Sequence, residues 1–71
     1  MITYEAIESF INSRLEYAAQ VPANAPLFEN QAFGAVEFAC TLVWKDNPEL
    51  ESKLISKWND EWHNLFTQLY A

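Results

Sequence analysis

The chain has few of the residues on which small domains and enzymes often depend. Its 71 residues include one cysteine, one histidine and one glycine. The single cysteine, Cys40, excludes a disulfide within the chain, so we expect a reducing, cytoplasmic setting. Cys40 lies in an apolar run, where a lone thiol behaves as a small hydrophobe. The single glycine, Gly34, is isolated, which excludes a glycine-rich phosphate-binding loop.

Basic residues are also scarce. Four Lys and Arg residues stand against ten Asp and Glu residues, so the formal net charge is −6. This charge repels phosphate backbones and anionic lipids, and we expect the chain to bind neither nucleic acid nor membranes. The carboxylates are spread along the chain and interleave with Lys53 and Lys57. Mimicry of nucleic acid needs dense charge on one face, so this spread disfavours it.

The sequence has no sustained alternation of β-branched and polar residues, and its apolar residues instead recur every three or four positions. This period predicts an all-α fold, a compact three-helix bundle with an antiparallel hairpin of the second and third helices. We expect one domain over residues 1–71, with helices at about 4–20, 31–45 and 48–70. A stiff proline-containing connector is expected at 21–30.

Residues at the predicted helix starts suggest how each helix is capped. Thr3 is suited to the N-cap of the first helix and Asn30 to that of the second. Asn47 followed by Pro48 is a typical start for the third helix. The first helix is expected to end near Gln20, because a proline at position 22 disfavours helical geometry in the residue before it.

The third predicted helix carries an aromatic stripe. Trp58, Trp62, Phe66 and Tyr70 follow one another at steps of four. One interpretation places the stripe in the core, and the other makes part of it a docking surface, since Trp and Tyr are favoured at interface hot spots. If Trp58 is core, its replacement by alanine should unfold the domain, whereas Tyr70→Ala should be mild.

The second predicted helix is apolar nearly all round, with Glu37 as its one charged residue before the C-terminal end. Either Glu37 emerges on an exposed strip, or it is a buried or interfacial carboxylate that pairs with Arg14, Lys53 or Lys57. The small residues Gly34, Ala35 and Ala39 allow a close helix crossing. The sequence does not decide whether that crossing lies within one chain or between subunits.

Two pairs of residues suggest chemistry, and neither pair is sufficient. Asp60 and His63 are three residues apart, as carboxylate–histidine pairs are in di-metal bundles, but a metal site usually takes more nitrogen or sulfur ligands. Cys40 with His63 is the only conceivable nucleophile and base, and nothing orients the two. We expect no enzyme activity, no catalytic residue, no metal and no cofactor.

Three wide apolar stripes carry more apolar surface than one small bundle readily hides, so part of that surface should meet another chain. We therefore expect a small acidic protein that acts through protein–protein association, as a homodimer. Its alternative is a monomeric adaptor or inhibitor with an apolar groove for a partner helix; a nucleic-acid mimic or a metal-binding protein is a third, weaker hypothesis. The candidate interface comprises Gly34, Phe38, Trp44, Trp62, Phe66 and Tyr70, with Glu37 as the candidate polar contact.

Overall fold

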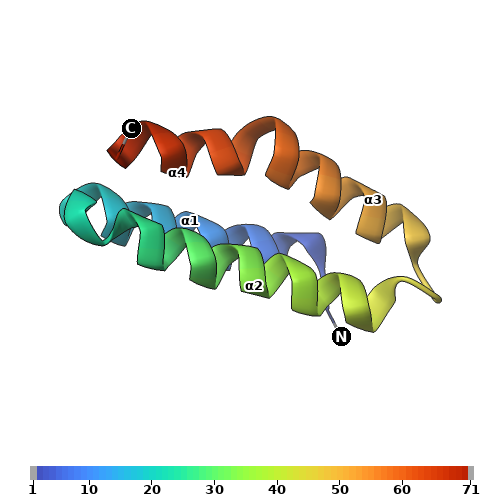
Figure 1. Cartoon of the computed structure of the whole chain (residues 1–71). Coiled ribbons are helices and arrows are strands. Elements are labelled where there is room, and N and C mark those ends of the chain that lie inside the picture. Colours follow the sequence, from blue (N-terminus) through green and yellow to red (C-terminus); the bar gives the residue numbers. More distant parts are fainter. Residues whose placement is uncertain (1, 71) are drawn as a thin grey trace.

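Helices make up nearly all of the computed structural model, which describes residues 2–70. Helix α1 spans Tyr4–Gln20, and a short 3-10 turn, η1, spans Pro22–Asn24. Helix α2 then spans Ala25–Val43. After a turn, α3 (Pro48–Lys57), the π-helical segment η2 (Trp58–Trp62) and α4 (His63–Tyr70) continue one another as a third long helix (Figure 1). No strand occurs within residues 2–70, and the predicted all-α, compact three-helix bundle is confirmed.

The starts of α1 and α3 follow the predicted capping chemistry. The Thr3 hydroxyl accepts a hydrogen bond from the Ala6 amide at 3.1 Å. The Asn47 side chain accepts one from the Leu50 amide, also at 3.1 Å. Each bond satisfies one of the amides that a helix start leaves without an intrahelical partner. Pro48 occupies the first turn of α3, where a missing amide hydrogen costs nothing.

The predicted connector at 21–30 is wrong, because α2 begins at Ala25 rather than near residue 31. Pro26 stands in the first turn of α2, where proline is compatible with a helix, so it begins this helix instead of excluding one. Of the two prolines in this stretch, Pro22 alone lies between helices, in the 3-10 turn η1. Asn30 consequently lies inside α2 and caps nothing, and α2 ends at Val43 instead of at 45.

The π-helical segment explains how the third helix keeps one face to the core. Its buried residues recur at steps of four: Leu50, Leu54, Trp58, Trp62 and Phe66. In an α-helix each step of four turns the side chain by roughly 40°, so such a series drifts around the axis. The wider turn at η2 counteracts this drift. Both tryptophans therefore reach the core from one helix.

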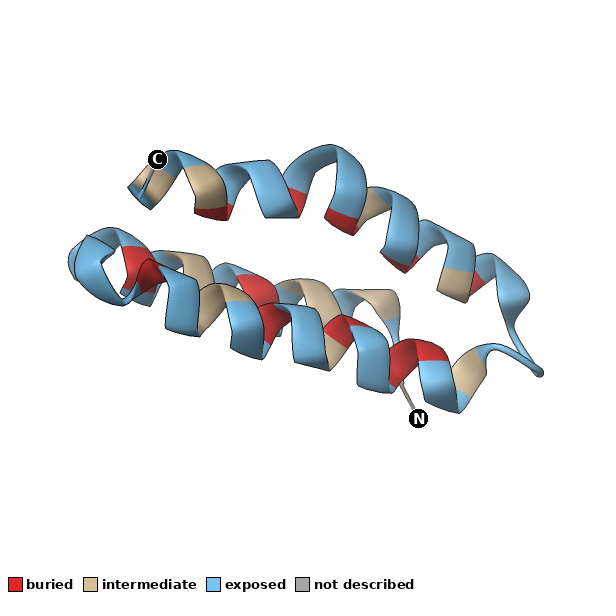
Figure 2. Ribbon diagram, in the orientation of Figure 1, coloured by how far each residue is buried: buried red, intermediate tan, exposed pale blue. Residues whose placement is uncertain are grey.

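Contacts between helices fix their relative directions. Glu29, near the start of α2, meets His63 and Tyr70 of α4, whereas Cys40, near the end of α2, lies against Glu51 of α3. Figure 1 shows the same reversal, with α2 running one way and the third helix returning beside it. In Figure 2 the buried segments lie on the sides of the helices that face one another.

The core combines large side chains of the third helix and Ile11 of α1 with small side chains of α1 and α2. Trp62 and Phe66 are 1% and 0% exposed, and Tyr4 of α1 stacks on Trp62 with ring centroids 6.1 Å apart. Four alanines, fully buried, let the backbones of α1 and α2 approach closely: Ala18, Ala25, Ala32 and Ala39. None of the helices within residues 2–70 is long and apolar enough to cross a membrane.

Candidate protein-interaction surfaces

A large share of the apolar side chains is left outside the core. Within residues 2–70, eleven large hydrophobic side chains are exposed: Phe10, Tyr17, Val21, Leu27, Phe33, Phe38, Leu42, Trp44, Ile55, Leu65 and Tyr70. Scattered single residues of this kind are normal on soluble proteins, but contiguous patches mark contact sites. Most of these residues belong to α1 and α2, where they gather on two surfaces.

The first surface covers the junction of α1 and α2, and we call it the seam face. Its members recur at steps of three and four, so they share one side of each helix. They are Phe10, Arg14 and Tyr17 of α1 together with Leu27, Gln31, Gly34, Phe38 and Leu42 of α2.

Arg14 joins the two halves of the seam face. Its guanidinium donates a hydrogen bond to the Gln31 side chain at 3.2 Å. The same group lies over the rings of Phe10 and Tyr17, 5.1 and 4.8 Å from their centroids. Cation–π contacts of this kind hold the aromatic side chains in place. Arg14 therefore links the aromatic side chains of α1 to α2 across the seam face.

The seam face has no carboxylate, although the chain is strongly acidic. The acidic residues of α1 and α2 fall at the intervening positions, namely Glu5, Glu8, Glu16, Glu29 and Glu37. Arg14 is its one charged member. The seam face therefore combines exposed apolar side chains with an absence of carboxylates.

Gly34 lies in the middle of the α2 half of the seam face. A glycine inside a helix costs about 1 kcal/mol relative to alanine. Within residues 2–70, nothing lies within 4 Å of the position that a Cβ on Gly34 would take, and its backbone has no positive φ. The fold of the single chain therefore gives no reason for a glycine there, whereas a close approach by another helix would give one.

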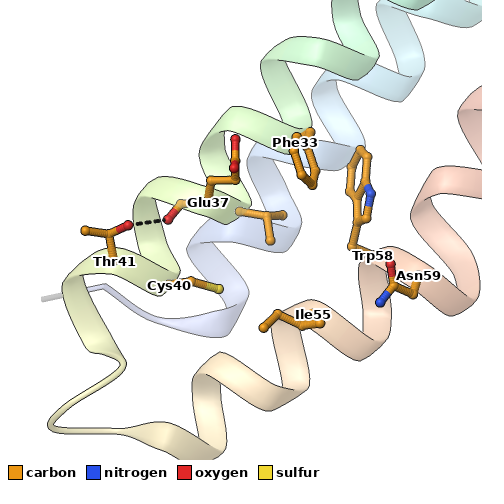
Figure 3. A pocket seen from close by; sticks show the side chains of 8 residues that line it. Phe33, Glu37, Cys40, Thr41, Ile55, Trp58 and Asn59 are labelled. Carbon is orange, nitrogen blue, oxygen red and sulfur yellow. Dashed lines mark hydrogen bonds between the residues drawn. The ribbon is translucent and has the colours of Figure 1, made fainter.

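The second surface is a groove between α2 and the third helix, which we call the α2–α3 groove. It contains a cavity of about 350 Å³, seen in Figure 3. The rings of Phe33 and Trp58 meet at one end with centroids 5.2 Å apart. Apolar walls come from both helices, and polar groups stand at the rim. The lining residues are Phe33, Val36, Glu37, Cys40, Thr41, Ile55, Trp58 and Asn59.

The groove continues past Phe33 and Trp58 into a smaller cavity of about 230 Å³, lined also by Glu29, Asn30 and His63. The Glu29 carboxylate accepts a hydrogen bond from the Tyr70 hydroxyl, and its other oxygen lies 2.7 Å from His63 Nδ1. The bond to Glu29 raises the pKa of Tyr70 above its usual 10.0. These contacts tie the end of α4 to the start of α2.

The groove holds Cys40 and His63, the two residues that the sequence offers as a nucleophile and a base. Burial, with Glu51 as a lesser cause, raises the pKa of the Cys40 thiol, which disfavours the reactive thiolate. His63 lies beside Glu29, eleven residues from Cys40 along α2, or about 16 Å at 1.5 Å per residue. Cys40 and His63 are therefore not a nucleophile–base pair. Within residues 2–70, no three His, Cys, Asp or Glu side chains are grouped to hold a metal.

The structure divides the predicted interface residues into two groups. Trp62 and Phe66 lie in the core, so their assignment to an outer contact surface is wrong; the π-helical segment keeps both directed inward. Gly34, Phe38, Trp44, Tyr70 and Glu37 are all exposed, and Phe38 is 64% exposed. Within residues 2–70, no ion pair engages Glu37, which stands on the exposed strip of α2.

The sequence reasoning missed the contribution of α1. Phe10 and Tyr17 were assigned no place on an outer surface, although both are exposed. The sequence does contain a signal for this surface: Phe10, Arg14 and Tyr17 follow one another at steps of four and three, and none of these positions is acidic. Phe33 and Ile55 were missed as groove residues because they approach each other only in the folded chain.

Comparison of the chain with protein-family models, with curated proteins and with solved structures finds no match.

Proposed function

We propose that this protein acts through protein–protein association rather than catalysis, as a homodimer joined through the seam face. The observation that carries the proposal is the combination of exposed aromatic and aliphatic side chains with the absence of carboxylates on that face. Two copies of an acidic chain repel each other, so a contact between them favours the part of the surface where acids are missing.

A two-fold arrangement fits this surface. In a symmetric dimer the same patch meets itself. The α1–α2 pair of one copy would therefore pack face to face on the α1–α2 pair of the other, as two layers of two helices. Gly34 would allow the two α2 helices to cross closely, with Phe38 and Leu42 packed beside the crossing. This differs from the interface expected from the sequence, because Trp62 and Phe66 of the third helix lie in the core.

The size of the seam face is sufficient for a modest dimer. Helix α2 has 19 residues and is therefore about 28 Å long, and two helices side by side are about 20 Å wide. The flat footprint is about 560 Å² per copy. Side-chain relief raises the accessible area above this figure, so the pair buries on the order of 1,200 Å², near the lower limit for specific interfaces. We therefore expect a dimer that dissociates on dilution.

The test is absolute molar mass by light scattering behind a sizing column, across about a tenfold range of concentration and at low and high salt. The wild-type chain should approach twice 8.2 kDa at the higher concentrations. It should remain dimeric in high salt, because an apolar contact is not screened. Phe38→Glu should be monomeric throughout, since it places a carboxylate in the centre of the contact.

Leu65→Glu is the matched control, because Leu65 is an exposed apolar residue of α4 outside the seam face. This variant should dimerise as the wild type does, and circular dichroism should show native helix content for both variants. A wild-type chain that stays at 8.2 kDa at all concentrations would contradict the proposal. A Phe38→Glu variant that dimerises normally would remove the seam face from the contact.

A further inference from the structure

We propose that the α2–α3 groove binds an amphipathic helix of another protein, which inserts an apolar side chain beside Phe33 and Ile55 and places a Lys or Arg against Glu37. The inference goes beyond the dimer, because the groove lies on the side of α2 that faces the third helix. It names a second site on the same chain with a different kind of occupant.

The walls of the larger cavity suit an apolar side chain. A volume of about 350 Å³ is within the range of sites that enclose a ligand group. Ile55 is 45% exposed and Phe33 is 42% exposed, so both have apolar surface that a partner would cover. Trp58 is already packed against Phe33 and Phe66 and gives the cavity a rigid wall. A preorganised wall lowers the entropy cost of binding.

Glu37 is the carboxylate of the groove that no ion pair engages within residues 2–70. Glu37 lines the larger cavity, and neither cavity is lined by Lys or Arg. Glu29 lines the smaller cavity but is already bonded to Tyr70 and lies 2.7 Å from His63 Nδ1. Arg14 belongs to the seam face, and Lys53 lies over the Tyr4 ring, 3.9 Å from its centroid. Lys57 pairs with Glu61. An apolar floor with the unpaired carboxylate of Glu37 and no Lys or Arg along its rim is complementary to a basic amphipathic segment.

A helix fits this groove better than a strand. Binding by strand addition needs a free sheet edge, and residues 2–70 contain no strand. From Glu29 to Thr41 the two cavities follow α2 for twelve residues, or about 18 Å. That length matches about three turns of a helix, with anchors at positions i, i+4 and i+7. A helix lying there would complete a four-helix arrangement.

A second copy of this chain does not supply such an occupant. Within residues 2–70, α3 is the helix with two basic residues, and both are engaged: Lys57 pairs with Glu61 and Lys53 lies over the Tyr4 ring. Its formal charge of −6 also opposes contact with an acidic rim. The occupant is therefore another protein with a basic amphipathic helix.

The experiment is selection of binders to the wild-type chain from a displayed library of helical peptides of about fourteen residues. Large apolar residues are allowed at i, i+4 and i+7, and the flanking positions vary freely among Lys, Arg, Glu, Gln and Ala. Enriched sequences are then synthesised with a fluorescent label, and their dissociation constants are measured by anisotropy. We expect enrichment of Lys or Arg at the flanks and saturable binding.

Three variants locate the binding. Ile55→Glu adds a charge to the cavity and should weaken binding of the enriched peptides at least about tenfold. Leu65→Glu, the same kind of change at an exposed site of the third helix outside the groove, should leave binding unchanged. Glu37→Gln keeps the shape and removes the charge, so it should weaken binding about threefold to fivefold, as a partly exposed ion pair would.

Any of three results would overturn the proposal: no enrichment above background, enrichment of acidic or neutral flanks, or equal binding to Ile55→Glu and the wild type. The Phe38→Glu variant separates this proposal from the dimer. Peptides should bind that monomeric variant as they bind the wild type, since the change lies outside the groove. If Phe38→Glu loses dimerisation but keeps peptide binding, the dimer uses the seam face and the peptide uses the groove. If Phe38→Glu keeps dimerisation but loses peptide binding, the peptide binds at the seam face and the groove proposal fails.

Discussion

Replacing Gly34 by alanine should stabilise the monomer and weaken the dimer. Nothing lies within 4 Å of the new Cβ in the single chain, and the backbone of Gly34 has no positive φ. The monomer should therefore gain the full difference in helix propensity, about 1 kcal/mol. In a domain of this size, that gain raises the melting temperature by about 4–8 °C. In the dimer, the methyl group would stand where the two α2 helices cross and would hold them apart.

The two effects are measured under different conditions. Thermal unfolding followed by circular dichroism, at concentrations below the dimer dissociation constant, gives the stability of the monomer. Light scattering or sedimentation at higher concentration gives the dissociation constant, which the alanine should raise. Asn12→Ala is the control. Asn12 is exposed in the middle of α1 and off the seam face, so this change should stabilise the monomer by about 0.5 kcal/mol without altering dimerisation.

Two results would refute the reasoning about Gly34. If the alanine variant melts higher and dimerises as tightly as the wild type, Gly34 does not lie at the contact, and the seam face loses its central element. If the monomer of the variant is no more stable than the wild type, the open space around Gly34 is filled by something other than solvent, and the helix-propensity argument fails.

Three further outcomes are expected. Trp58→Ala should cost about 3–5 kcal/mol in urea unfolding, comparable with the whole stability of a 71-residue domain, whereas Tyr70→Ala should be mild; a cooperative, wild-type-like melt of the first variant would remove Trp58 from the core. The Cys40 thiol should react with a disulfide reagent more slowly than a free thiol, because burial raises its pKa and reduces the thiolate at neutral pH; equal rates would show an open thiol. Because the bond to Glu29 raises the pKa of folded Tyr70 above the unfolded value of 10.0, the stability it contributes is fully present below pH 10 and lost as the pH rises through the raised pKa; unfolding free energies across that range should fall, and less so for Tyr70→Phe.

The helices could be read from the sequence wherever local chemistry determines them. Thr3, Asn47 and Pro48 act at helix starts through their own side chains, and the predicted starts of α1 and α3 are confirmed. The same local reasoning failed at Pro26, because a proline in the first turn of a helix and a proline in an extended connector look alike in sequence. The choice between them depends on tertiary packing, in which Ala25 and Ala32 of α2 are fully buried.

The division between core and surface was harder to predict. Trp62, Phe66 and Phe38 are all aromatic residues within apolar helical patterns. Trp62 and Phe66 are nevertheless buried, whereas Phe38 is 64% exposed. The π-helical segment turns both Trp62 and Phe66 of the third helix toward the core, and the apolar spacing in the sequence does not predict it. On α2, apolar residues occur on nearly every side. Only the position of the neighbouring helices determines which of them are covered.

The placement of carboxylates distinguishes the two surfaces of α2 more clearly than hydrophobicity does. A contact between two copies joins chains of equal charge, so a carboxylate within that contact would face another acidic surface. The seam face has no carboxylate. A groove for a basic segment gains from an unpaired carboxylate at its rim, and the α2–α3 groove has Glu37 there. Both surfaces carry exposed phenylalanine, so apolar area alone would assign them the same role. The charge pattern favours an identical copy on one side of α2 and a basic partner on the other, and it is for this reason that Phe38→Glu and Ile55→Glu should affect different assemblies.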